Sequence, residues 1–313
     1  MIDFYDMRGV RGIHKHAYLI IAHNEFEILE KLILMLDDQR NDIYLHIDNK
    51  VKNFDFPKFF ALPLKSRIYF VSRQNVNWGS FSQIECELRL LESAHKGNYN
   101  YYHLLSGVDL PLKTQDEIHN FFISRQGTEF IHFSKDFDDE IINRVRLFHI
   151  FQDAMGLSRN KVIKLIIKSI NKSFIFVQKI LGVNRLKMNE FKLKYGSQWF
   201  SITHDFAAFM LDSKKWINKY FKYSFCGDEL FVQTLAYNSR FRSRLSGEVS
   251  KNSYLCCRRY IDWERGNPFI WRTADFNQLI NSDYMFARKF SGSIDVNIVE
   301  KIYFYLDQQK NRL

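Results

Sequence analysis

Two short strand-like segments with an amphipathic helix between them lie near the N-terminus of this 313-residue chain. The first segment, from His16 to Ala22, is a continuous apolar run. Asn24 and Glu27 then have the spacing of a helix start, and apolar residues recur at helical intervals as far as Leu36. Residues 42–48 alternate apolar and polar side chains, which is typical of a strand. Because two strands joined through a helix are parallel, this pattern predicts an α/β fold.

The stretch from Tyr101 to Thr114 predicts a further strand, a tight turn and another helix. Ser106-Gly107 breaks the apolar run, Asp109 follows it, and Thr114 with Glu117 has the spacing of a capping box. In an open α/β sheet, ligands bind at the carboxyl ends of the strands, where Gly107, Asp109 and the earlier Asp48 would lie. The alternative is a buried strand with an ordinary turn. No G-x-G-x-x-G motif precedes these acids, so a dinucleotide site is not expected.

Two tryptophans and a pair of acids accompany glycines at the ends of predicted elements. Trp78 lies in the loop before a capped helix, and Trp199 follows a glycine turn. Such rings can stack on a sugar or a base, or they can anchor a loop in the core. Asp228 and Glu229 come at the start of a helix, where the helix dipole favours acids. The same position keeps a carboxylate ionised, as a general base requires, so both explanations stay open.

Three further groups of charged residues are candidates for binding a diphosphate or a metal. Asp136-Phe137-Asp138 matches the D-x-D pattern that can clamp a divalent cation, although an acidic solvated surface is the alternative. Arg258 and Arg259 lie in a predicted strand, and Arg288-Lys289 lie near the C-terminal end. Cations gathered in this way can neutralise a diphosphate without a metal, or they can form ordinary basic surface.

The formal net charge of +10 favours anionic partners, such as a nucleotide, a phospholipid or nucleic acid. Basic and apolar residues alternate through residues 141–190, and Asp153 is the only acid before Glu190. This composition predicts a basic helical insertion within a single domain of residues 15–313. The insertion could lie on an anionic membrane surface, or it could pack its apolar side on the rest of the domain.

The four cysteines show no paired metal-ligand spacing, and two of them are adjacent, which fits a reducing compartment. No apolar run is long enough to span a membrane, and the start of the chain does not have the pattern of a signal peptide. We therefore expect a cytoplasmic protein that can reach the inner face of the membrane through its basic insertion.

Several short motifs follow one another along the chain, namely Ala17–His23, Leu45–Asp48, Trp78–Ser80, Leu105–Thr114, Gly196–Trp199, Asp228-Glu229 and Phe286–Phe290. In this order and spacing the chain resembles the Core-2/I-branching β-1,6-N-acetylglucosaminyltransferases and their peptide xylosyltransferase relatives. The resemblance implies a GT-A-like fold, with a Rossmann-like mixed sheet flanked by helices. It also implies inverting transfer from a UDP-sugar, with neither a metal nor another cofactor required.

The resemblance implies roles for the residues at the matching positions. Glu229 would be the catalytic base, and Lys289 with Arg288 would bind the diphosphate. Arg259 would assist them, with Arg258 or Arg272 as alternatives because the register of that stretch is loose. The other implied contacts are Asp48, Trp78, Gly107 and Asp109 to the donor, and Glu129, Arg146 and Trp199 to the acceptor. The D-x-D match at Asp136-Phe137-Asp138 is then attributed to chance.

A bacterial enzyme of surface polysaccharide synthesis fits this chain better than a Golgi enzyme, because the membrane anchor and cysteine pattern of the animal enzymes are not seen. We expect transfer of N-acetylglucosamine or xylose to a hydroxyl of a glycan acceptor, which could be lipid-linked. The alternative is a basic nucleic-acid or membrane-surface binding protein without catalysis, although no helix-turn-helix, zinc-finger or RNP signature is visible. Donor sugar, acceptor, linkage position and oligomeric state are not determined by the sequence.

Overall fold

A six-stranded mixed sheet forms the centre of the protein, with the strand order β3-β2-β1-β4-β7-β6. The computed structural model describes residues 14–62, 64–135, 138–157, 160–186, 191–247 and 252–310. The first four strands in the chain, β1 to β4, are parallel where they pair, and β7 pairs antiparallel with both β4 and β6. Their bounds are β1 His16–Ala22, β2 Asn41–Ile47, β3 Arg67–Phe70, β4 Tyr101–Ser106, β6 Phe130–Ile131 and β7 Phe200–Thr203.

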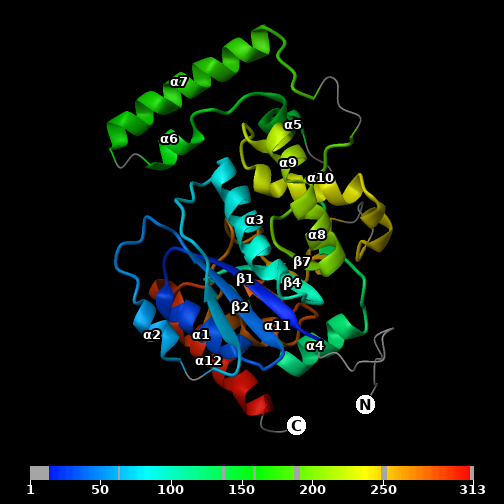
Figure 1. Ribbon diagram of the computed structural model, residues 1–313. Coiled ribbons are helices and arrows are strands. Elements are labelled where there is room, and N and C mark those ends of the chain that lie inside the picture. Colours follow the sequence, from blue (N-terminus) through cyan, green and yellow to red (C-terminus); the bar gives the residue numbers. More distant parts are fainter. Residues whose placement is uncertain are drawn as a thin grey trace.

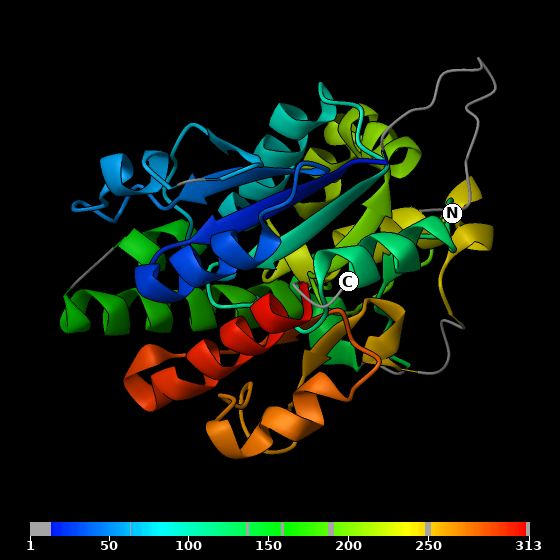
Figure 2. The same cartoon turned by 90° about the horizontal axis from the view of Figure 1, so that it is seen from below.

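Both faces of this sheet are covered by helices (Figures 1 and 2). Alternate residues of β1 feed two separate cores, since Tyr18 and Ile20 pack on one face while Ala17 and Leu19 pack on the other. Helices α1 and α12 lie on the first face, and α3, α8 and α10 lie on the second. Their bounds are α1 Phe26–Leu36, α12 Gly292–Lys310, α3 Phe81–His95, α8 His204–Asp212 and α10 Phe231–Tyr237.

A second sheet of three short strands, ordered β5-β9-β8, packs beside the first core. It joins the turn after β4 to the C-terminal part of the chain, because β5 pairs antiparallel with β9. The strands are β5 Leu110–Pro111, β8 Arg259–Ile261 and β9 Phe286–Arg288. The remaining helices around the two sheets are α2 Phe56–Phe60, α4 Gln115–Ile123, α9 Lys214–Phe221 and α11 Phe276–Ile280, with short 3₁₀ turns η1 Gly227–Glu229, η2 Arg240–Arg244, η3 Tyr254–Cys256 and η4 Thr273–Asp275.

The expected βαβ unit is present, but its helix begins differently from the prediction. Glu25, rather than Asn24, is the residue before the first helical turn, and its φ of 52° is left-handed. Its carboxylate accepts hydrogen bonds from the Ser291 hydroxyl (2.6 Å) and the Gly292 backbone N–H (3.2 Å). A contact to the far end of the chain therefore takes the place of the local cap that the sequence indicates.

The basic segment from about residue 141 to 190 contributes α5 Asp139–Arg146, α6 Gln152–Leu157 and α7 Lys161–Ile180. Helix α7 lies at the periphery of the molecule, beyond α3 and α9 (Figure 1). The side chain of Gln178 is buried and fixes this helix, donating to the Phe148 carbonyl (3.0 Å) and accepting from the Phe148 N–H (2.8 Å). Among the described residues, no helix combines the length and the apolar character that crossing a bilayer requires.

Candidate active site

A large cavity opens at the carboxyl ends of the parallel strands, with a volume of about 1250 Å³. Residues just beyond β1, β2 and β4 line it on one side, and segments from the C-terminal half of the chain close the other. Five residues that the sequence singles out line this cavity, namely Asp48, Trp78, Trp199, Glu229 and Arg288. Asp48 and Trp78 follow parallel strands, whereas Trp199 comes just before the antiparallel β7, Glu229 lies in η1 and Arg288 ends β9 of the second sheet.

Glu229 lies in η1, the short 3₁₀ turn before α10. Cys226, in the left-handed region with a φ of 48°, makes the sharp turn that precedes it, and the Glu229 carbonyl accepts from the Gly196 N–H at 2.9 Å. The carboxylate accepts from Arg144 at 2.7 Å. Burial raises the pKa of Glu229 above its usual range, and the charge and hydrogen bond of Arg144, with a hydrogen bond from Tyr195, offset part of that rise. A raised but ionisable carboxyl suits a general base near neutral pH.

Arg288 is the last residue of β9 and lines the cavity beside the turn that follows β4. Its guanidinium donates to Asp109 at 2.8 Å and to the hydroxyl of Ser106. Asp109 is 1% exposed and also accepts from the backbone N–H of Ser106 at 2.9 Å, so the carboxylate is fixed in place. The guanidinium carbon of Arg288 also lies over the Trp199 ring, 4.4 Å from the ring centre. The turn acid identified in the sequence therefore positions a cation rather than lining the cavity itself.

Further cations gather around His23 at the mouth of the cavity. Burial lowers the pKa of His23, Asp48 opposes this effect, and the nearby charges of Lys289, Lys50 and Arg288 lower the pKa further. Lys50 lies 3.4 Å from Asp48 across its ammonium and carboxylate groups. Lys289 is thus close to the cavity without being one of the residues that line it. The positive potential of this group suits a ligand with more than one negative charge.

Trp78 presents its ring to solvent at the cavity wall. It is 75% exposed, and the edge of its indole contacts Phe225, with ring centres 5.4 Å apart. Gly79 beside it has a φ of 75° and lies against the Phe225 ring, so a side chain is excluded at this position. An exposed indole held by such a turn is available to stack on a flat ring.

Besides Asp109 and Lys289, four of the predicted site residues do not line the cavity. Gly107 has a steric role, because a Cβ there would lie 2.8 Å from the Cβ of Ala22. Arg259 is fully buried, and its guanidinium donates to Ser201 Oγ (2.7 Å) and to the carbonyls of Cys257, Leu104 and Phe200. Its proposed substitutes Arg258 and Arg272 also lie outside the cavity lining.

The other two displaced residues are Glu129 and Arg146. Glu129 is fully buried and accepts from the backbone N–H of Thr203 (2.9 Å) and from its hydroxyl (2.6 Å). Arg146 is half-buried on α5, and its guanidinium lies 3.4 Å from the Asp139 carboxylate. Neither side chain lines the cavity. Of the D-x-D match, Asp136 and Phe137 lie outside the described residues, while the Asp138 carboxylate caps α5 by accepting from the Ile141 N–H at 3.1 Å.

Comparison with known proteins identifies the family of this chain. The profile of the family described as Core-2/I-Branching enzyme matches residues 16–278. The chain belongs to the Core-2/I-branching enzyme family. The match runs from β1 into α11 and includes every residue of the cavity lining except Arg288. The mixed sheet flanked by helices is a GT-A-like glycosyltransferase fold.

Curated relatives of this Core-2/I-branching family member are distant in sequence. The human β-1,3-galactosyl-O-glycosyl-glycoprotein β-1,6-N-acetylglucosaminyltransferase is 20% identical over 91% of this chain and 68% of its own length. Mouse N-acetyllactosaminide β-1,6-N-acetylglucosaminyl-transferase is 19% identical, over 88% of this chain and 68% of its own length. Mouse xylosyltransferase 2 is 20% identical over 93% of this chain, which spans only 33% of that relative.

Sequence reasoning did not single out Arg144, Tyr195 or two glutamines of the cavity lining, Gln83 and Gln198. Gln83 donates to Asp228 at 3.0 Å and Gln198 donates to Glu87 at 3.4 Å. Burial, reinforced by the charge of Glu229, raises the pKa of Asp228 to about 7. Nothing in the local sequence distinguishes Arg144 from Arg146, because only the packing of α5 decides which of the two faces inward. The position of Gln198 in the G-S-Q-W motif is the one signal that could have marked it.

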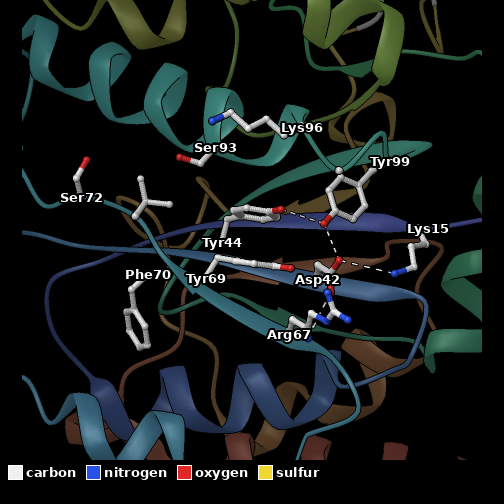
Figure 3. A pocket seen from close by; sticks show the side chains of 12 residues that line it. Lys15, Asp42, Tyr44, Arg67, Tyr69, Phe70, Ser72, Ser93, Lys96 and Tyr99 are labelled. Carbon is white, nitrogen blue, oxygen red and sulfur yellow. Dashed lines mark hydrogen bonds and ion pairs between the residues drawn. The ribbon is translucent and has the colours of Figure 1, made fainter.

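A second, smaller cavity of about 590 Å³ lies near the amino ends of β1, β2 and β3 (Figure 3). Its one acid, Asp42, is already engaged, since it accepts from the Tyr99 hydroxyl at 2.6 Å and lies 3.8 Å from the ammonium of Lys15. The hydroxyl groups of Tyr44 and Tyr99 are 3.0 Å apart and complete the network. Asp42 is thus committed to internal contacts, and we place the active site at the larger cavity.

Proposed function

We propose that this protein catalyses the inverting transfer of a sugar from a UDP-sugar to a hydroxyl of a glycan acceptor, giving a β-linkage. One observation carries the proposal, which is the placement in a single cavity of Glu229 and of Arg288 held by Asp109. Such a displacement needs a general base for the acceptor hydroxyl and a fixed cation for the leaving group, and both line this cavity.

In the proposed single displacement, Glu229 removes the proton of the acceptor hydroxyl as its oxygen attacks the anomeric carbon. The bond from that carbon to the diphosphate oxygen breaks on the opposite face, so an α-linked donor gives a β-linked product. A positioned general base typically accelerates such a step by about 10²–10⁴-fold. Arg144 orients the carboxylate by its 2.7 Å hydrogen bond, and Tyr195 supports it from the cavity wall.

We assign charge stabilisation on the leaving diphosphate to Arg288 and Lys289 instead of a bound metal. The Arg288 guanidinium has a fork of donors that matches phosphate oxygens, and its attachment to Asp109 limits reorganisation during the reaction. Asp48 and Trp78 would hold the uridine, and Trp199 would contact the acceptor. These assignments extend the family resemblance to residues that the cavity lining supports.

The names of the relatives suggest N-acetylglucosamine or xylose as the donated sugar. We propose a role in bacterial surface polysaccharide synthesis, with the enzyme in the cytoplasm and its glycan acceptor linked to a lipid of the inner membrane face.

Helix α7 supports peripheral contact with an anionic membrane. Its five lysines recur at intervals that place them on one stripe, and the helix contains no acid. Large apolar side chains lie beside that stripe and away from the buried Gln178, with Leu165 65% exposed and Ile180 68% exposed. A helix with exposed apolar and basic sectors suits the interface of an anionic bilayer. Such contact would bring the cavity to a lipid-linked acceptor.

The proposal is tested by incubating the protein with a panel of nucleotide sugars and measuring binding and slow hydrolysis, followed by transfer to candidate glycans. We expect UDP-sugars to bind, and EDTA to leave the transfer rate unchanged. Glu229→Gln should bind UDP as tightly as the unmodified protein and lose transfer by at least about 10²-fold. Unchanged turnover in that variant would remove Glu229 from the mechanism. Salt-sensitive DNA binding without affinity for UDP would favour a nucleic-acid binding protein instead.

A further inference from the structure

Three histidines converge at the amino end of β1, far from the active-site cavity at its carboxyl end. His14 and His16 are two residues apart on an extended segment, so their side chains lie on the same face. His119 comes from α4, which packs against that face. One ring nitrogen from each of the three histidines lies within 4.8 Å of the others. Among the described residues, this is the one group of three or more His, Cys, Asp or Glu side chains with such spacing.

Four ring nitrogens of this cluster are buried and have no hydrogen-bond partner. They are both ring nitrogens of His14, Nε2 of His16 and Nδ1 of His119, while His16 and His119 are themselves fully buried. A buried polar atom without a partner is uncommon, and several in contact with one another call for an explanation such as an ion.

The tautomer of His119 is fixed by its surroundings. The Asn41 side chain donates its amide N–H groups to the Leu36 carbonyl (2.8 Å) and to Gln115 Oε1 (2.7 Å), which leaves its Oδ1 as an acceptor. His119 Nε2 lies 2.8 Å from that oxygen and must carry the proton. Its Nδ1 therefore keeps a lone pair that no hydrogen-bond donor uses. This is the arrangement in which an outer hydrogen bond orients a metal-binding imidazole.

His16 has an equivalent outer partner. Its Nδ1 lies 3.1 Å from His103 Nε2, and His103 Nδ1 lies 2.7 Å from the hydroxyl of Ser201. The hydroxyl oxygen has two lone pairs and can accept from both Arg259 and His103. In that arrangement His103 accepts the Nδ1 proton of His16, and Nε2 of His16 is left with a lone pair. Buried Arg259, which donates to the same hydroxyl, is thus the last member of the series of hydrogen bonds that orients His16.

We propose that His14, His16 and His119 bind one zinc ion, which joins the start of β1 to α4. Neutral imidazole nitrogen is a preferred ligand of Zn²⁺, and three protein ligands leave a fourth position for water. The donor set contains no carboxylate, so calcium and magnesium are disfavoured.

The charge state of the rings agrees with this assignment. Burial lowers the pKa of His14 to about 4 and that of His119 to about 3, and it lowers the pKa of His16 as well. All three rings are therefore neutral at pH 7, as metal ligands must be. The rings of His16 and His119 are stacked with centres 4.0 Å apart. Because the lone pairs lie in the ring planes, binding requires the two rings to tilt apart until each nitrogen lies about 2.0–2.1 Å from the ion.

The proposed ion takes no part in sugar transfer, since the cluster and Glu229 lie at opposite ends of the sheet. The zinc site and the proposed function can therefore fail independently. Chelation should lower the melting temperature while leaving the transfer rate of the folded enzyme unchanged. Loss of activity in Glu229→Gln has no bearing on zinc content.

The test uses full-length protein purified without a polyhistidine tag. We expect about one zinc per chain by elemental analysis, and visible absorption of tetrahedral cobalt after exchange with Co²⁺. Adding zinc to about a hundredfold excess over its dissociation constant should raise the melting temperature of metal-free protein by about 5 °C. Both His119→Gln and His14→Gln should lose the zinc, the cobalt spectrum and the shift.

His95→Gln is the matched control, because His95 stacks on His204 and, among the described residues, this pair belongs to no group of three metal-ligating side chains. It should retain zinc and the full thermal shift. His14 is only partly buried, so His14→Gln gives an answer even if His119→Gln does not fold. The proposal is overturned if metal-free protein shows neither zinc binding nor a shift, or if His14→Gln binds zinc as well as the unmodified protein.

Discussion

The guanidinium of Arg288 lies 2.8 Å from the carboxylate of Asp109, although the two residues come from distant parts of the chain. Asp109 is almost completely buried, and Arg288 lines the cavity. The antiparallel pairing of β5 with β9 brings them together. A buried acid thus holds the cation that we assign to the leaving diphosphate.

Replacing Asp109 by asparagine should therefore weaken donor binding as well as stability. The side chain keeps its shape, but the charge that holds Arg288 is lost. We expect a loss of about 2 kcal/mol in the free energy of unfolding, measured in urea. UDP affinity, measured by calorimetry, should fall because Arg288 is no longer fixed. Asp205→Asn is the control, since its exposed pair with Arg244 should contribute less than about 1 kcal/mol. Equal UDP affinity in both variants would contradict the positioning role.

Arg144 and Arg146 should differ in their effects on the pH dependence of transfer. The charge of Arg144 lowers the pKa of Glu229, so removing it in Arg144→Gln leaves the carboxyl with a higher pKa. A base works in its ionised form, and the acidic limb of the kcat profile should therefore move to higher pH. We expect a several-fold lower rate near pH 6 and substantial recovery at high pH. Arg146→Gln should leave the limb in place; a matching shift in both variants would mean that Arg144 does not tune Glu229.

Glu129 should make the protein less stable as the pH rises from about 4 to about 7. Burial raises its pKa to about 7 in the folded state, against about 4.3 in an unfolded chain. In this interval the unfolded state releases its proton first, which favours unfolding. This group should lower the free energy of unfolding by on the order of 3 kcal/mol between these two pH values, and Glu129→Gln should remove that decrease. Urea unfolding at each pH provides the measurement.

The slope will not vanish in Glu129→Gln, because burial raises the pKa of Glu87 and Asp228 in the same direction. Glu300→Gln, at the partly buried ion pair with Lys31, serves as the control and should keep the original slope. An unchanged pH dependence in Glu129→Gln would show that this carboxyl is ionised in the folded protein.

The lysines of α7 should control binding to anionic vesicles. Each lysine near such a surface contributes roughly 1 kcal/mol, so Lys161, Lys164 and Lys168 changed together to glutamine should weaken binding by about 10²-fold. Leu165→Asp should weaken it through the apolar sector. Vesicles of phosphatidylglycerol and phosphatidylcholine, compared by co-sedimentation, provide the measurement. Lys301→Gln and Lys310→Gln on α12 are the controls; equal loss in these variants would point to net charge rather than to α7.

The periodicity of the sequence was sufficient to predict the β1-α1-β2 unit, the β4 turn and the capped α4, because their signals are local. Thr114 and Glu117 form the expected capping box. The sequence also indicated that Asp48 and Asp109 lie near the carboxyl ends of strands and that Glu229 lies near the start of a helix. The start of α1 was predicted wrongly, since the partner of Glu25 comes from the other end of the chain.

The sequence by itself determined the alternation of strands and helices, the family motifs and the excess of positive charge. Only the tertiary structure decided which charged residues face the cavity. Arg144 and Arg146 are two residues apart on one helix, so roughly 200° separates their side chains, and packing selects the first. Arg259 and Arg288 lie on paired strands, yet Arg259 is fully buried, whereas Arg288 lines the cavity and is fixed by Asp109. These choices depend on contacts between distant segments, which local periodicity does not encode.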